Sequence, residues 1–135
     1  MKIILPMRRF DNLIMIDVFI WNLNQQKYSQ MLITLDTGAS VTTISSDILH
    51  KLGYDITSGI SRRITTASGI EYVKALNVEK LKIGSIEQTN VETYAHSFPQ
   101  ESFSLGVLGL NVLQKFDVNL LFSKRQVELT PLNKE

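Results

Sequence analysis

The sequence predicts a single all-β domain that carries one or two short helices. Apolar residues alternate with other residues in short runs, for example Ile14, Ile16, Val18 and Ile20, and this period of two is typical of a half-buried strand. Turn-forming residues separate the runs. The chain has 135 residues, 44% of them apolar and 20% charged, which suits one hydrophobic core. We therefore expect one domain over residues 1–135.

The first half of the chain is expected to form a hairpin, a further strand and a short helix. The expected strands are Leu13–Trp21, Tyr28–Leu35 and Val41–Ile44. The polar turn Asn22–Gln25 joins the first two strands. Ser45, Ser46 and Asp47 offer capping oxygens to a helix that runs through Leu52, and Gly53 can end it.

The second half begins with a projecting hairpin. Its arms, Ile64–Thr66 and Ile70–Val78, flank Ala67, Ser68 and Gly69, where glycine can adopt a positive φ. A polar surface loop is expected from His96 to Ser104, and Val112, Leu113 and Phe116 lie at helical spacing. The remaining expected strands are Leu81–Ile83, Val91–Ala95, Leu105–Leu108, Val118–Phe122 and Gln126–Leu129.

Composition excludes several classes of function. The net charge of +1 indicates neither a nucleic-acid-binding protein nor one that binds anionic membranes, and no apolar run is long enough to span a bilayer. The absence of cysteine excludes disulfides, thiolate metal sites and cysteine nucleophiles. His50 and His96 belong to no metal-spaced cluster, so we expect no metal and no cofactor. Pro6, Arg8 and Arg9 interrupt the apolar start, which argues against export, and we expect a cytoplasmic protein.

One short motif indicates catalysis. Asp36-Thr37-Gly38 follows the apolar strand Ile33–Leu35 directly and enters a turn of small residues, Ala39 and Ser40. The tripeptide alone is weak evidence, and an ordinary turn carboxylate that accepts main-chain N–H bonds is the alternative. A second signal lies about seventy residues downstream, where Leu105-Gly106-Val107-Leu108-Gly109 precedes a short helix that begins near Asn111.

Together these features resemble the retropepsin-like aspartic proteases. The resemblance runs over nearly the whole chain, except for Met1–Phe10, the loop around His96–Ser104 and the tail after Pro131. It implies a closed, barrel-like fold and a homodimer in which each subunit supplies one catalytic aspartate. The implied partner is a peptide or protein substrate, and the implied activity is that of an aspartic endopeptidase whose two Asp36 carboxylates activate a water molecule.

The resemblance also implies roles for individual residues. Asp36 would be the catalytic acid and base, Thr37 would hydrogen-bond across the two active-site loops, and Gly38 would allow close approach of the main chain. The residues that would contact substrate are Ala39 and Ser40 beside the cleft, Ala67, Ser68 and Gly69 at the tip of a flap, and Val107 and Leu108, which would line pockets or pack beneath the active-site loop. Gly109 would permit chain segments to cross closely.

Two departures weaken one part of the resemblance. The retroviral enzymes usually place an acid four residues after the catalytic aspartate and an arginine after the later glycine, whereas this chain has Ser40 and Leu110. The loss of both partners is self-consistent, because one buried charge left alone would be costly. It nevertheless removes an expected support of the dimer. A catalytically inactive dimerisation or peptide-binding module of the same fold is therefore the alternative function.

Overall fold

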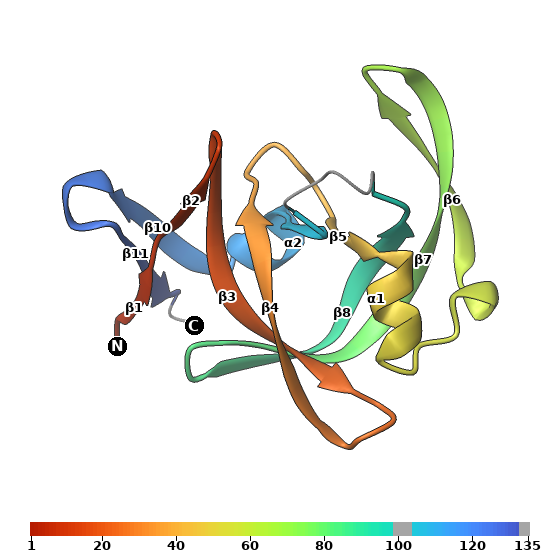
Figure 1. Ribbon diagram of the computed structural model, residues 1–135, viewed down its shortest axis with the longest axis horizontal. Coiled ribbons are helices and arrows are strands. Elements are labelled where there is room, and N and C mark those ends of the chain that lie inside the picture. Colours follow the sequence, from red (N-terminus) through yellow and green to blue (C-terminus); the bar gives the residue numbers. More distant parts are fainter. Residues whose placement is uncertain (99–103, 133–135) are drawn as a thin grey trace.

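The computed structural model describes residues 1–98 and 104–132. They form two antiparallel-rich sheets and two short helices around one core (Figure 1). The strands are β1 (Ile3–Pro6), β2 (Arg8–Phe10), β3 (Leu13–Asn22), β4 (Lys27–Leu35), β5 (Thr42–Ser45), β6 (Ile60–Thr66), β7 (Gly69–Ile83), β8 (Ile86–His96), β9 (Gly106–Leu108), β10 (Phe116–Leu121) and β11 (Gln126–Pro131). The helices are α1 (Ser46–Lys51) and α2 (Leu110–Leu113), with single 3-10 turns at Ile56–Ser58 and Phe122–Lys124.

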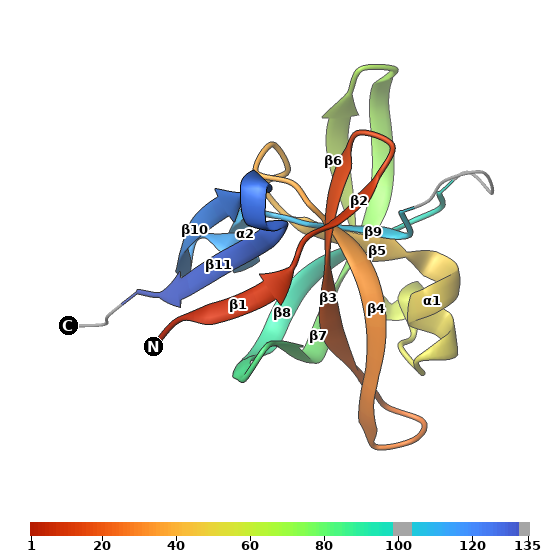
Figure 2. The same ribbon diagram turned by 60° about the vertical axis from the view of Figure 1, so that its left-hand side comes forward.

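The larger sheet closes on itself and gives the predicted barrel-like fold. Its strand order is β2-β3-β4-β9-β5-β8-β7-β6, and a further pairing joins β3 to β7. This closing contact is short, with Phe19 opposite Lys82 and Ile20 opposite Leu81. The smaller sheet has the order β1-β11-β10 and lies beside the barrel, as Figures 1 and 2 show. The all-β prediction is confirmed.

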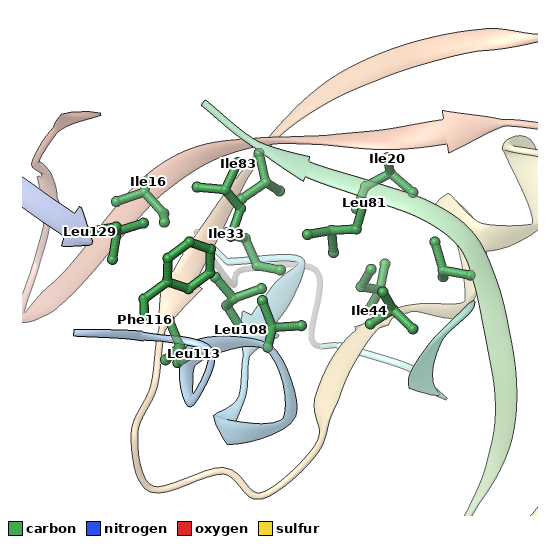
Figure 3. Packing of buried hydrophobic residues seen from close by; sticks show 14 of the residues in the cluster. Ile16, Ile20, Ile33, Ile44, Leu81, Ile83, Leu108, Leu113, Phe116 and Leu129 are labelled. Carbon is green, nitrogen blue, oxygen red and sulfur yellow. The ribbon is translucent and has the colours of Figure 1, made fainter. Parts of the chain in front are cut away.

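The core fills the space between the strands that carry the candidate site and those that close the barrel. Ile33 of β4, Ile44 of β5 and Leu108 of β9 are each fully buried. Figure 3 shows them packed with Ile83 from β7 and with Phe116 and Leu129 from the smaller sheet region. Full burial of each such side chain contributes about 1.5–3 kcal/mol before entropy costs. The site is thus mounted on three strands that each contribute a fully buried residue to the core.

Most of the expected elements are present with shifted ends. The first hairpin, the strand after Ser40 and the helix before Gly53 are confirmed. Gly53 and Gly69 have φ of 96° and 119°, which fits their expected places at a helix end and a hairpin tip. Ser45 is the residue before α1, but it makes no side-chain capping bond, so that part of the helix prediction was wrong.

Three expectations need correction. Ile70–Val78 and Leu81–Ile83 are parts of one continuous strand, β7, because β8 pairs along it from Lys74 to Ile83. Phe116 opens β10 instead of continuing the second helix, which ends at Leu113. The unassigned start of the chain forms β1 and β2, since β1 finds its partner in β11, more than a hundred residues away.

Within the described residues, neither helix has the length needed to cross a membrane. Most of the predicted loop His96–Ser104 lies outside the described residues, although His96 itself ends β8.

Candidate active site

The candidate site is built where three strands meet. β9 lies between β4 and β5, parallel to β4 with Leu35 opposite Leu108, and antiparallel to β5 with Thr43 opposite Val107. The chain therefore leaves β4 at Leu35, passes over the end of β9 as the loop 36–41, and returns as β5. Because β9 pairs with the strand before the loop and with the strand after it, β9 fixes both ends of the Asp36 loop.

Asp36 is fixed by main-chain hydrogen bonds at its start. Its N–H donates to the Leu108 carbonyl at 3.1 Å, and its own carbonyl accepts from Ala39 N–H at 3.2 Å. Its carboxylate Oδ1 accepts from Gly38 N–H at 2.9 Å. The side chain is half-buried, whereas Thr37 and Gly38 are exposed. Among the described residues Oδ2 has no hydrogen-bond partner, so one carboxylate oxygen is oriented by the loop while the other is available to a ligand.

The end of the loop is held by the start of α2. The N–H groups of Leu110 and Asn111 donate to the carbonyls of Ala39 and Ser40 at 2.8 and 3.1 Å. Gly109 makes this approach possible, because a Cβ there would lie 2.6 Å from the Val41 carbonyl carbon and 2.8 Å from the Thr42 nitrogen. These contacts are with the main chain, which cannot move aside as a flexible side chain would. The close crossing expected at Gly109 is present.

Sequence reasoning missed Asn111 and Thr42 as supporting residues. Asn111 Oδ1 accepts from Thr42 N–H at 2.8 Å and from Thr42 Oγ1 at 2.9 Å, and Asn111 Nδ2 donates to the Glu92 carbonyl at 2.8 Å. Thr42 Oγ1 in turn accepts from Gly109 N–H at 3.0 Å. The one available signal was an asparagine at the start of a helix that lacked another capping side chain. This network joins β5, α2 and β8 directly behind the loop.

A second small network lies at the other side of β9. Thr34, the residue before Leu35, donates its hydroxyl to Ser104 Oγ at 2.6 Å, and Ser104 Oγ donates to the Gly106 carbonyl at the same distance. Both Thr34 and Ser104 are buried. These bonds satisfy polar groups that would otherwise be costly inside the core. They also fix the position at which β9 enters the site.

The departures at Ser40 and Leu110 now have a structural context. Ser40 is exposed, and Leu110 has 39% of its surface exposed. Within one subunit the loop and the helix are joined by main-chain bonds and by Asn111 rather than by an ion pair. An uncharged pair at these positions is therefore compatible with a fixed loop.

The predicted substrate-contacting residues fall into three groups. Ala39 and Ser40 belong to the loop that carries Asp36, and Val107 is half-buried beside it. Leu108 is fully buried in the core (Figure 3), which supports packing beneath the loop and not the lining of a pocket. Ala67, Ser68 and Gly69 are exposed at the tip of the β6–β7 hairpin, which projects on the same upper side of Figure 1 as the loop 36–41.

Within the described residues, no group of three or more histidine, aspartate or glutamate side chains is placed to hold a metal ion. Two of the acids outside the motif have ordinary structural partners. Asp17 pairs with Arg8 at 3.2 Å, and Asp55 caps the 3-10 turn at Ile56–Ser58 through Thr57. Asp36 remains the acid that the fold places at a strand end beside β9.

The family model described as "gag-polyprotein putative aspartyl protease" matches residues 22–115. The chain belongs to this family. Its fold is similar to that of a retropepsin-like aspartic protease from Rickettsia conorii, with a TM-score of 0.70 and 24% sequence identity over 96% of this chain and 89% of that one. At that identity the likeness shows a retropepsin-like fold and no more. No curated protein matches the chain in sequence.

Proposed function

We propose that this retropepsin-like protein is an aspartic endopeptidase that works as a homodimer and hydrolyses peptide bonds with two Asp36 carboxylates, one from each subunit. The observation that carries the proposal is the position of Asp36. Its main chain is fixed by β9 and Ala39, and one carboxylate oxygen is oriented by Gly38 while the side chain is partly exposed. Such a fixed acid suits chemistry that needs a defined geometry.

The reaction needs two carboxylates because one cannot be acid and base at once. Two carboxyl groups a few ångströms apart share one proton, since ionising both would place like charges together. The ionised member removes a proton from water, while the protonated member donates to the scissile carbonyl oxygen. The product of this step is a tetrahedral intermediate without a covalent bond to the enzyme. Thr37 supports the pairing, because within the described residues its hydroxyl makes no hydrogen bond in its own subunit.

The second copy would approach from the side that carries the loop 36–41. The loop tip and the β6–β7 hairpin lie toward the upper side of Figures 1 and 2, and β10 lies at the left-hand side of both views. β10 is the outer strand of the order β1-β11-β10, so one side of its main chain has no partner strand among the described residues. An unpaired edge is a ready template for a strand of another chain. Antiparallel pairing of two β10 edges would supply support that the missing ion pair does not.

A substrate would lie between the active-site loop and the hairpin. Ala39, Ser40 and Val107 would contact it from below, and Ala67, Ser68 and Gly69 would close over it from above. An extended peptide suits this arrangement because hairpin main chain can pair with peptide main chain. A Cβ added at Gly69 would meet no other atom within 4 Å, so the tip has space to adapt.

The test compares the protein with its Asp36→Asn variant on a peptide library at mildly acidic and neutral pH. The asparagine side chain keeps the size of the aspartate and can accept from Gly38 N–H, so a loss of cleavage with unchanged thermal stability would assign the chemistry to the carboxylate. Equal cleavage by both proteins would refute the assignment. No cleavage by either protein would favour the inactive binding module.

Sedimentation across protein concentration tests the shared site. We expect activity per subunit to fall in step with the dimer fraction on dilution. A monomer that retains full activity would contradict the proposed pair of Asp36 residues.

A further inference from the structure

Only the inner part of the β6–β7 hairpin is paired with a third strand. β8 pairs with β7 only from Ile83 to Lys74, where Lys74 lies opposite Ala95. Beyond that point the hairpin consists of β6 and β7 alone, from Arg62 opposite Val73 to Thr66 opposite Gly69. Two paired strands without a third are marginally stable by themselves. The position of this outer part therefore depends on side-chain contacts with the body of the protein.

One contact between a histidine and a carboxylate spans the junction. His96, the last residue of β8, has its Nε2 3.8 Å from Oε1 of Glu71, which lies on the outer part of β7. The other carboxylate oxygen of Glu71 accepts from Thr66 Oγ1 at 3.0 Å. Thr66 Oγ1 also accepts from Ser68 N–H at 3.2 Å. A chain of polar contacts thus leads from the hairpin tip through Glu71 to the end of β8, whose place beside the hairpin Figure 1 shows.

His96 is itself held in place by the body of the protein. Its backbone pairs in register with Ser45 of β5, the strand that follows the Asp36 loop. Its ring also meets Phe98 edge-on, with centroids 5.9 Å apart. His96 is therefore fixed to the strands that hold the candidate site. Glu71 belongs to the β6–β7 hairpin, which would move relative to those strands if the hairpin closed.

We propose that Glu71 and His96 form a pH-dependent latch that holds the β6–β7 hairpin in a fixed position relative to the end of β8. Imidazole is the side chain whose ordinary titration falls between about pH 5 and 8. When His96 is protonated, it attracts the Glu71 carboxylate and the hairpin is held. As pH rises and the imidazole becomes neutral, the attraction is lost and the hairpin is released. Both side chains are more than a third exposed, so we expect a change of only about two- to fivefold in the ratio of held to released hairpin.

Other polar and charged groups near the pair do not take the place of His96 as the partner of Glu71. Tyr72 and Lys74 line a cavity of about 280 Å³ together with His96, Ser46 and Ser61. Arg62 and Arg63 face Val73 and Tyr72 across the hairpin and are exposed. None of these groups forms an ion pair with Glu71 in the described part of the chain, where His96 is the partner of that carboxylate. Among ordinary side chains it is imidazole that changes charge between about pH 5 and 8, so a pH step in this range would point to His96.

A spin label on the hairpin tests the latch without catalysis. The chain has no cysteine, so Thr65→Cys gives a single attachment point at an exposed residue, and Asp36→Asn prevents self-cleavage. We expect the ratio of ordered to mobile label to fall about two- to fivefold from about pH 5 to about pH 8. Glu71→Gln should remove this step, and His96→Lys, which keeps a positive charge, should leave the label ordered throughout.

Arg63→Gln is the matched control, because it removes an exposed charge from the same hairpin without touching the pair. It should retain the pH step. The latch is refuted if the parent shows no step, if the step persists in Glu71→Gln, or if Arg63→Gln removes it as well. Far-ultraviolet circular dichroism at each pH confirms that every variant is folded.

The kinetic consequence rests on the proposed function. In the active protein we expect KM for a peptide to rise about two- to fivefold from about pH 5 to about pH 8. In Glu71→Gln that part of the KM profile should be flat, while the pH dependence of kcat follows the Asp36 pair as before. A KM profile unchanged by Glu71→Gln would contradict the latch. If no peptide is cleaved, the proposed function fails while the spin-label result still decides the latch.

Discussion

Removal of the Asn111 side chain should loosen the active-site loop, although this side chain hydrogen-bonds to Thr42 and Glu92 and not to the loop 36–41 itself. Thr42 is fully buried, and both its N–H and its hydroxyl donate to Asn111 Oδ1, at 2.8 and 2.9 Å. In Asn111→Ala these two donors lose their acceptor inside the core. Each unsatisfied buried group costs about 1–3 kcal/mol. The Glu92 carbonyl also loses its bond from Nδ2, but it can turn to water because Glu92 is exposed.

We therefore expect Asn111→Ala to lower the free energy of unfolding by about 2–4 kcal/mol. Urea unfolding followed by circular dichroism measures it, in an Asp36→Asn background and at one protein concentration, because the stability of the proposed dimer would depend on concentration. Gln114→Ala is the control, since Gln114 is exposed at the end of the same helix and should change stability by less than about 0.5 kcal/mol.

A double-mutant cycle with Thr42→Val shows whether the two side chains act together. Thr42→Val keeps the N–H bond to Asn111 but removes the hydroxyl that links Asn111 to Gly109 N–H. If the network is one unit, the two losses should differ from additive by at least about 0.5 kcal/mol. Additive losses, or an Asn111→Ala effect no larger than that of Gln114→Ala, would refute the reasoning.

Three further outcomes follow from the geometry. Gly109→Ala should destabilise the protein by about 3 kcal/mol or more, because its Cβ would meet main-chain atoms at 2.6 to 2.9 Å; a thermal melt close to that of the parent would contradict the close crossing. If the proposed homodimer brings the two active-site loops together, Leu110→Glu should raise its dissociation constant about tenfold or more, because an unpaired carboxylate would be buried between the loops; an unchanged dissociation constant in sedimentation would contradict a place for Leu110 in that interface. The hydrogen bond from Thr57 Oγ1 lowers the pKa of Asp55, so Thr57→Val should raise that pKa toward its ordinary value in an NMR titration. The stabilisation from this bond is present above the ordinary pKa of aspartate and is lost as pH falls through the lowered value, so parent and variant should converge in acid; a stability difference that grows in acid would contradict it.

The strands and turns near Asp36 could be predicted because they depend on local pattern. Alternation in Leu13–Trp21 and Tyr28–Leu35 matches β3 and β4, and the positive φ of Gly69 fits a hairpin tip. The errors at Phe116 and at the start of the chain have a common cause. Phe116 lies at helical spacing from Val112 and Leu113, but in the sheet it pairs with Pro131 of β11. The strand β1 could not be predicted from local pattern, because it forms by pairing with β11. Pairing between distant segments overrides local preference.

The sequence by itself determined which residues form the candidate site: an acid at a strand end in Asp36-Thr37-Gly38, a later Val107-Leu108-Gly109, and no cysteine or metal-spaced cluster. Only the tertiary structure decided how the acid is held. The insertion of β9 between β4 and β5, the bonds from Asn111 to Thr42, and the contact of His96 with Glu71 join residues that lie 25 to 73 positions apart. Such contacts depend on how strands are ordered in a sheet, and no local pattern of side chains specifies that order.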